Sequence, residues 1–193
     1  MFIAQPESTP ATEKVYKSSA DSQGFVMNLT KAWAWRPDVF DGFAALRSEL
    51  TSQSTLSKRE LTLLVCATAS ELGDAYCALA WGRTLAQSTS EDVAAAVISD
   101  LPSLELGERD QALTSWARKV VRDPNATTAA DVQSLRDSGL SEREIFEATL
   151  FVAFRLAFST VNDALGVKPD RELVELVPKH VRAAIDFGRS ADA

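Results

Sequence analysis

The 193-residue sequence is poor in cysteine, histidine, glycine and proline. Its two cysteines, Cys66 and Cys77, are too few for a disulfide framework and indicate a reducing compartment. The single histidine, His180, lies near the C-terminus, where we expect it to be exposed. With only 8 Gly and 7 Pro beside many alanines and leucines, the composition favours helix.

Long apolar runs and excess positive charge are also missing. No segment approaches the roughly 18 apolar residues of a membrane span, and the first residues lack the basic start and apolar stretch of a signal peptide. The net charge of −7 argues against a partner rich in phosphate, whether nucleic acid or an anionic membrane. We therefore expect a cytoplasmic protein with neither nucleic acid nor membrane as a partner.

Cofactor motifs are absent as well. The chain has no Walker loop, no dinucleotide glycine fingerprint and no cluster of metal ligands. The sequence therefore predicts no cofactor and no metal.

Apolar residues recur at helical spacing along most of the chain, and no segment reads as a strand. We expect a flexible arm over residues 1–22, followed by a single all-α domain over residues 23–193 with about seven to nine helices. The segment 140–166 is apolar nearly all round, which predicts a buried central helix. The predicted helices cover residues 38–50, 58–72, 74–86, 91–99, 108–123, 128–139, 140–166 and 178–187.

Two helix starts carry the same signature. Ser57 with Glu60, and Ser141 with Glu144, form capping boxes, in which each side chain hydrogen-bonds the other residue's backbone N–H. The surrounding letters, "LSKRE" and "LSERE", are similar. Either capping boxes simply resemble one another, or the chain contains an internal repeat.

Gly73 interrupts the apolar pattern between the helices predicted over 58–72 and 74–86. Glycine is the usual left-handed residue at a helix C-terminus, and Asp74 is a candidate N-cap for the next helix. The sequence therefore predicts a helical hairpin that carries Cys77 within the first turns of its second arm. On that arm Tyr76 and Trp81 point about 140° apart, so we expect them on different faces.

The segment from "LSKRE" through the turn to "YC" resembles the alkylhydroperoxidase D and carboxymuconolactone decarboxylase superfamily. More narrowly, it looks like the superfamily's branch of uncharacterised peroxidase-related proteins. The likeness extends through "DV..LR..GLS" to the closing "DALGV", and so covers about residues 24–167. It implies an alkylhydroperoxidase D-like helical bundle.

The resemblance also implies a site, which this sequence matches in part. Active peroxidase members carry Cys-x-x-Cys, a histidine next to the second cysteine and another four residues after it. Here Cys77 takes the place of the second cysteine, whereas Asp74 replaces the first. Tyr76 and Trp81 replace the histidines. Cys77 is therefore the candidate nucleophile, and these three neighbours are the other candidate site residues.

Two acidic residues complete the candidate site. The family's relay glutamate falls on Thr62, with Glu60 nearby, and Glu71 could approach Cys77 across the turn. Each has an ordinary reading too, since Glu60 is a capping-box residue and Glu71 suits a solvated surface.

Two effects of opposite sign act on the pKa of the Cys77 thiol. A peroxidase needs a thiolate, and the helix N-terminus lowers a thiol pKa, while the like charge of Asp74 raises it. Cys66 is the only other thiol that could resolve a sulfenic acid, but we expect it to be a small buried apolar residue instead.

Two classes of function follow. The resemblance implies a peroxidase that reduces alkyl or hydrogen peroxide through Cys77 and is regenerated by an external thiol. The alternatives are a carboxymuconolactone decarboxylase-like enzyme without a cysteine pair, or a non-redox binding or assembly protein. A pocket lined by Tyr76 and Trp81 would favour small-molecule binding or altered chemistry. The resemblance further implies a homo-oligomer, as a dimer, trimer or hexamer.

Overall fold

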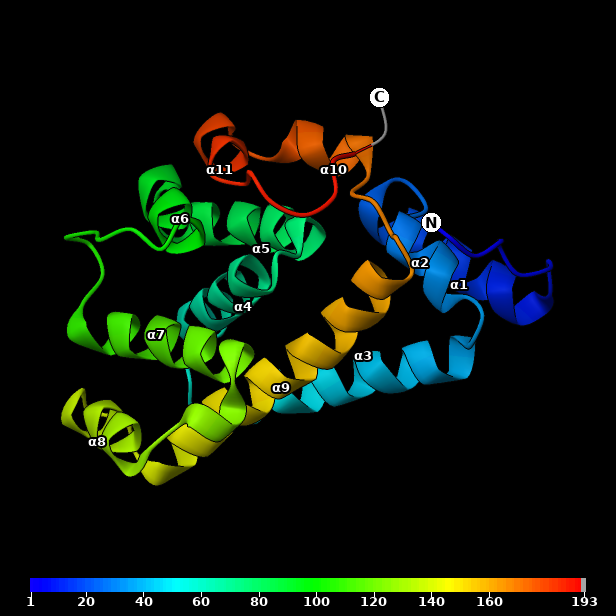
Figure 1. The fold of residues 1–193 in the computed structure, drawn as a ribbon. Helices are drawn as coiled ribbons and strands as arrows, with labels where there is room; N and C mark the ends of the chain where they lie inside the picture. The colour runs from blue at the N-terminus through cyan, green and yellow to red at the C-terminus, as the bar shows by residue number, and fades with distance from the viewer. Residues whose placement is uncertain (192–193) are drawn as a thin grey trace.

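The computed structural model describes residues 1–191, which form helices and no strand (Figure 1). This confirms the all-α prediction. Of the eleven α-helices in that range, eight have seven residues or more, in line with the seven to nine expected. They are α1 (Pro10–Gln23), α2 (Asn28–Trp33), α3 (Pro37–Ser52), α4 (Lys58–Leu72), α5 (Ala75–Ser88), α6 (Glu91–Ile98), α7 (Glu108–Arg122), α8 (Ala129–Asp137), α9 (Glu142–Ala164), α10 (Arg171–Leu176) and α11 (Lys179–Ala183), with a 3-10 turn at Pro124–Ala126.

The predicted hairpin is present between α4 and α5. Gly73 ends α4 with a φ of 80°, the left-handed conformation that glycine adopts without steric cost. Asp74 then caps α5, because its Oδ1 accepts a hydrogen bond of 2.9 Å from the backbone N–H of Cys77. The two helices therefore fold back on each other and hold Cys77 near their junction.

The central helix is α4 and not α9, contrary to the prediction for residues 140–166. Every residue of α4 from Leu61 to Ala69 is buried, and α4 packs against α5, α6, α7 and α9. One apolar cluster joins it to α5, α6 and the C-terminal helices, and a second joins it to α7, α8 and α9. By contrast, α9 exposes apolar side chains on one face, including Phe146 and Leu150. Some of its apolar residues are buried in the core and others are exposed to solvent, and the sequence pattern does not distinguish the two groups.

The N-terminal segment differs from the expected flexible arm over residues 1–22. Most of it is α1, which starts with Pro10 after a capping box between Thr9 and Thr12. The helix buries Val15 and Ser19, and the Ser19 hydroxyl accepts a hydrogen bond of 3.1 Å from the Met27 backbone. The helix-start signals were therefore present in the sequence, although the polar composition hid them.

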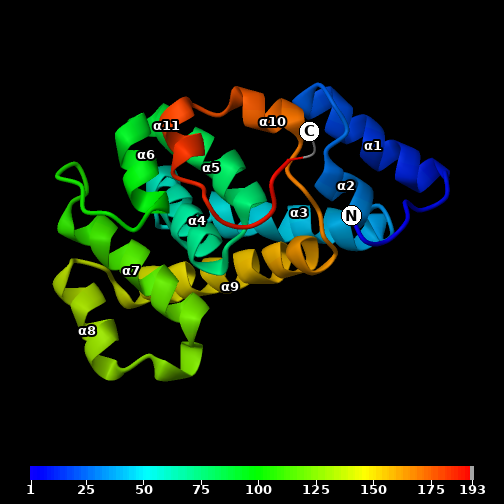
Figure 2. The same ribbon diagram turned by 45° about the horizontal axis from the view of Figure 1, so that its top comes forward.

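The C-terminal helices cross over α5, and α11 packs against both α5 and α6 (Figure 2). Gly82 on α5 permits this close approach, because a Cβ there would lie 2.7 Å from Val181 and 2.8 Å from Ile98. The helix expected over residues 178–187 is shorter, at Lys179–Ala183. No helix within residues 1–191 combines the length and apolar character needed to cross a membrane.

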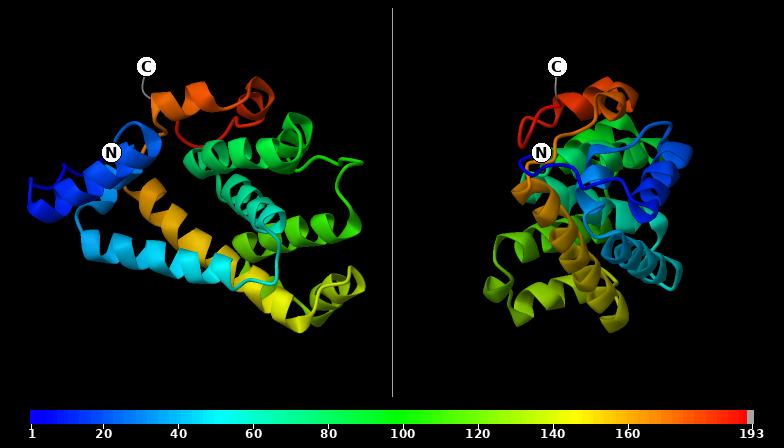
Figure 3. Two further views of the ribbon diagram at one scale, coloured as in Figure 1. Left: turned by 180° about the vertical axis from the view of Figure 1, so that it is seen from behind. Right: turned by 90° about the vertical axis from the view of Figure 1, so that its right-hand side faces the viewer.

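On the other side of the bundle, α3 runs alongside α9 (Figure 3). Their contact is aromatic: the ring of Phe43 lies 5.4 Å from that of Phe154 and 6.2 Å from that of Phe158. No residue of α3 is fully buried. This helix therefore forms an outer wall of the molecule, supported by ring contacts.

Candidate functional site

A cavity of about 480 Å³ lies among α1, α3, α5 and α9, and Cys77 forms part of its wall. From α5 the cavity also receives Tyr76, Ala80 and Trp81. We expected Tyr76 and Trp81 on different faces, yet both line this cavity. The reason is that residues 76, 77, 80, 81 and 84 form one broad stripe on α5, with the two large rings near its edges.

The Cys77 thiol is buried, with 3% of the residue exposed. Its Sγ accepts hydrogen bonds from Nη2 of Arg155 at 3.2 Å and from the hydroxyl of Ser159 at 3.5 Å. Burial raises the pKa of Cys77 to about 12, and the charge of Asp74 adds to that effect, while Arg155 acts in the opposite direction. The resting group is therefore a neutral thiol beside a cation.

Arg155 is held in place by aromatic rings. Its guanidinium carbon lies 5.3 Å from the ring centre of Trp81 and 5.3 Å from that of Phe158. Only 4% of the residue is exposed, and its buried Nε has no hydrogen-bond partner within residues 1–191. The rings fix the guanidinium plane at the cavity wall, and they leave hydrogen-bond donors unused.

Asp74 lies beneath the cavity rather than in its wall. It is fully buried, with Oδ1 engaged as the helix cap and Oδ2 without a partner in the described part of the chain. Burial and the charge of Asp74 together raise the pKa of Asp163 on α9 to about 7. Asp74 therefore adds negative potential behind the sulfur of Cys77.

Tyr76 connects the cavity to the C-terminal half of the chain. Its hydroxyl donates a short hydrogen bond to Oδ2 of Asp170, and Oδ1 of Asp170 accepts one of 2.8 Å from the Asn28 backbone. Burial and the charge of Asp170 raise the pKa of Tyr76, so that the phenol stays protonated. This hydrogen bond orients the Tyr76 ring at the edge of the cavity.

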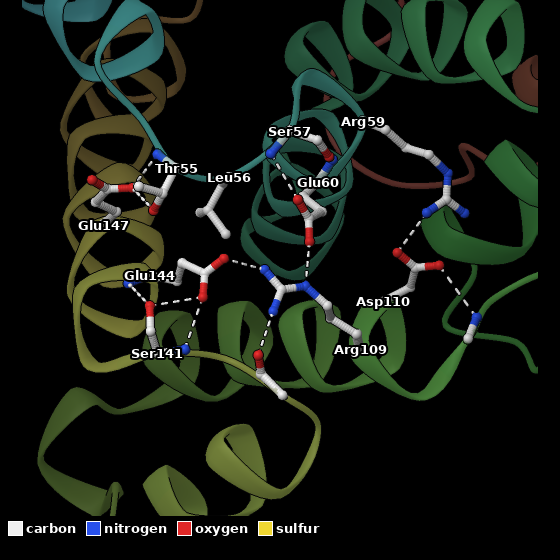
Figure 4. Close-up of polar contacts among 12 residues, drawn as sticks. Thr55, Leu56, Ser57, Arg59, Glu60, Arg109, Asp110, Ser141, Glu144 and Glu147 are labelled. Carbon is white, nitrogen blue, oxygen red and sulfur yellow. Dashed lines mark hydrogen bonds and ion pairs between the residues drawn. The ribbon is translucent and has the colours of Figure 1, made fainter.

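Glu60 lies at the start of α4 and does not line the cavity. Its side chain closes the capping box on Ser57 and pairs with Arg109 at 2.5 Å. Arg109 also pairs with Glu144 of the second capping box at 2.5 Å, so that one guanidinium joins the starts of α4 and α9 (Figure 4). The two similar sequence segments therefore meet at a shared cation.

Three other residues considered from the sequence also lie outside the lining. Glu71, at the end of α4, pairs with Arg122 at 2.5 Å and with Arg118 at 3.5 Å. Thr62 is buried, and its hydroxyl bonds the backbone of its own helix. Cys66 is fully buried and unpaired, and burial raises the pKa of its thiol. The structure thus brings Cys77, Tyr76 and Trp81 together at the cavity, with Asp74 behind them.

Sequence reasoning missed the residue that contacts the sulfur most closely. Arg155 lies within the apolar run "FVAFRLAF" and is the only charged residue between Glu147 and Asp163. A lone cation in the apolar stretch of a helix is costly to bury without a partner or a role, and this was the signal that could have identified it. Ser159, four residues later, lies on the same face of α9.

No group of three or more His, Cys, Asp and Glu side chains within residues 1–191 is arranged to hold a metal ion. His180 is exposed, with its Nδ1 3.0 Å from a carboxylate oxygen of Asp92, and neither residue lines the cavity.

Comparison with known proteins gives matches among solved structures only. No protein-family model and no curated protein matches the chain. An alkylhydroperoxidase AhpD core, an uncharacterised peroxidase-related protein from Ralstonia eutropha JMP134, is 25% identical with a TM-score of 0.79. The match covers 92% of this chain and 97% of that one. An uncharacterised peroxidase-related protein from Silicibacter sp. TM1040 is 23% identical with a TM-score of 0.77, covering 90% and 93%.

The debrominase Bmp8 has the same architecture at 16% identity, with a TM-score of 0.72 over 96% of this chain and 97% of that one. A cysteine-to-alanine variant of Bmp8 has been solved in complex with 2,3,4-tribromopyrrole. Sequence identities this low show a shared fold and do not show a shared activity. The shared helical architecture and the near-complete coverage of both chains show that this chain has the alkylhydroperoxidase D-like fold.

Proposed function

We propose that the protein is a peroxidase-related enzyme that reduces an organic hydroperoxide through Cys77. One observation carries the proposal: the only thiol in the cavity lining lies 3.2 Å from a buried guanidinium that can stabilise its anion. The two structures with the highest TM-scores given above are described as peroxidase-related, which supports the same chemistry.

The size of the cavity favours an organic substrate over hydrogen peroxide. A volume of about 480 Å³ is within the range of small-molecule sites, about 300–1,000 Å³, whereas a water-sized molecule occupies only about 30 Å³. Aromatic side chains form much of the wall, including Trp81, Phe43 and Phe154. We therefore expect the alkyl or aryl group of an organic hydroperoxide to fill the cavity, with the peroxide group of that substrate next to Cys77.

The proposed step has a simple balance. The Cys77 thiolate attacks the terminal peroxide oxygen of ROOH, so that an S–O bond forms, the O–O bond breaks and the leaving alkoxide takes a proton to become ROH. An external thiol then condenses with the sulfenic acid, releasing water and forming a mixed disulfide. A second external thiol reduces that disulfide and restores Cys77. External thiols are required because Cys66 does not line the cavity.

A second candidate is a non-redox binding protein, or an enzyme that performs other chemistry in the same cavity. The raised pKa of Cys77 supports this candidate, because a neutral thiol is a poor nucleophile. Asp74 stands where the family's first cysteine is found, and no histidine lines the cavity. The carboxymuconolactone decarboxylase side of the superfamily and the debrominase Bmp8 indicate what other chemistry such a scaffold can carry.

The reductant and compartment follow from the same proposal. Both cysteines are unpaired, which supports a reducing compartment such as the cytoplasm, where small thiols are abundant.

The test is peroxide consumption with dithiothreitol as reductant, together with sulfenic-acid trapping, in wild type and Cys77→Ser. Cumene hydroperoxide and hydrogen peroxide are compared, and Cys66→Ser is the matched control. We expect turnover of cumene hydroperoxide to exceed that of hydrogen peroxide, to vanish in Cys77→Ser and to persist in Cys66→Ser. Turnover that survives Cys77→Ser, or no turnover up to pH 9, would remove the peroxidase proposal and leave the second candidate.

A further inference from the structure

The charge of the cavity is opposite in sign to that of the protein. The chain carries a net charge of −7, yet three cationic side chains line the cavity, Lys14, Arg47 and Arg155, against a single carboxylate, Asp41. Asp41 lies 3.9 Å from Lys14, and both are well exposed. The guanidinium groups of Arg47 and Arg155 are left without an ion-pair partner within residues 1–191.

Arg155 offers the deeper of these two charges. Its Nη2 donates to Cys77, whereas neither Nε nor Nη1 has a hydrogen-bond partner in the described part of the chain. The rings of Trp81 and Phe158 each lie 5.3 Å from the guanidinium carbon and take up space beside the group. Edge-on approach is the geometry in which a guanidinium binds a carboxylate.

Arg47 faces the same space from α3. Burial of its guanidinium lowers the pKa of Arg47, and the positive charge of Arg155 lowers it further. Two like charges therefore act on each other across the cavity with no protein anion paired to either. An anionic ligand would relieve this repulsion, because it adds an attraction to both guanidinium groups.

The rest of the wall is apolar and rigid. Phe43 and Phe154 lie 5.4 Å apart at the α3–α9 contact, and Phe158 is stacked on Trp33 at 5.0 Å. Trp33 is itself fixed by a 2.8 Å hydrogen bond from its Nε1 to Asn162. Such a wall selects an apolar or aromatic body for the ligand.

We propose that the cavity binds an organic carboxylate, whose apolar body lies among the α3 and α9 aromatic side chains and whose anion is held by Arg155 and Arg47. This inference rests on the proposed function only in taking the cavity as the binding site, and it names the substrate class. The hydroperoxide reduced at Cys77 would then be one that also carries an acid group.

Binding of 4-phenylbutanoate and its neutral isostere 4-phenylbutanamide tests the inference by isothermal titration calorimetry at pH 7.5. The proteins are wild type, Cys77→Ser, Arg47→Gln and Arg155→Lys, each checked for native helix content by circular dichroism. Arg171→Gln is the matched control, since it removes one exposed cation that pairs with Glu175 outside the cavity. Arg47 as a residue is exposed to solvent, although neighbouring atoms partly desolvate its guanidinium, so its variant is expected to fold.

We expect the wild type to bind the carboxylate at least about tenfold more tightly than the amide, as a charge-assisted hydrogen bond predicts. Cys77→Ser and Arg171→Gln should keep that preference, and Arg47→Gln and Arg155→Lys should reduce it to about threefold or less. Equal affinities in wild type, no binding of the carboxylate up to about 10 mM, or a preference that survives in both cavity variants would overturn the proposal. A preference lost equally in Arg171→Gln would overturn it too.

Failure of this inference is distinguishable from failure of the proposed function. Carboxylate preference without peroxide turnover leaves the anion site standing and removes the peroxidase. Turnover of cumene hydroperoxide without carboxylate preference removes the anion site and leaves the peroxidase proposal standing.

Discussion

At the scale of single residues, the sulfur of Cys77 lies between two opposed charges. Arg155 donates to it from the cavity side, while Asp74 lies behind it with no hydrogen-bond partner for Oδ2 among residues 1–191. Burial favours the neutral thiol over the thiolate and raises the pKa of Cys77 to about 12. A ligand that changes the field around Arg155 would therefore also change the fraction of thiolate.

Asp74→Asn should make Cys77 more reactive at every pH. Asparagine caps a helix about as well as aspartate, so the change removes the charge and keeps α5. In wild type, the rate of iodoacetamide alkylation should rise about tenfold per pH unit from pH 7 to 10 without a plateau, because the thiolate fraction grows in that way well below the pKa. The variant should react several-fold faster, as measured by peptide mass spectrometry. A plateau near pH 8.5 in wild type would contradict this account.

At the scale of elements, the starts of α4 and α9 depend on each other. Each capping box uses its glutamate twice, once to close on a backbone N–H and once to pair with Arg109 (Figure 4). Nη1 of Arg109 also donates to the carbonyl of Gly139 at 2.8 Å. Two local helix-start motifs, 84 positions apart, thus become one tertiary connection.

Replacing Arg109 should cost more stability than replacing an ordinary surface arginine. Arg109→Met would leave two largely buried carboxylates facing each other, and we expect a loss of about 2 kcal/mol, or a decrease in Tm of roughly 4–8 °C. The control is Arg136→Met, whose solvent-exposed pair with Glu142 should contribute little to stability. Thermal unfolding followed by circular dichroism measures both. Equal losses would show that the connection adds nothing beyond a surface pair.

At the scale of the whole molecule, the cavity exists only because distant segments converge. Its wall combines residues of α1, α3, α5 and α9, so more than half of the chain length separates its first and last members. The face of α9 away from this cavity carries an exposed apolar stripe that no other helix within residues 1–191 covers. Its exposed members are Phe146, Leu150, Ala153, Ala157 and Val161.

We propose that this stripe joins a second copy of the chain, in keeping with the homo-oligomer that the resemblance implies. The stripe runs from Phe146 to Val161, about 22 Å along α9 at 1.5 Å per residue, and a continuous exposed apolar face of that length is unusual on a monomer. Phe146→Asp combined with Leu150→Asp should lower the mass measured by light scattering to that of a monomer. Leu104→Asp, on an exposed loop, should leave the mass unchanged. A wild type that is monomeric at all concentrations would refute this.

The sequence alone determined where most helices begin and end. The capping boxes at Ser57 and Ser141 and the left-handed Gly73 act through hydrogen bonds between residues at most a few positions apart, and such signals can be read from neighbouring letters. Tertiary structure decided the rest. It placed α4 and not α9 at the centre of the bundle and made α1 part of the cavity wall. It also brought Arg155 into contact with the sulfur of Cys77, 78 positions away in the chain. Those outcomes depend on which apolar faces pack together and which charges are buried with them, and these relations have no fixed spacing in the chain.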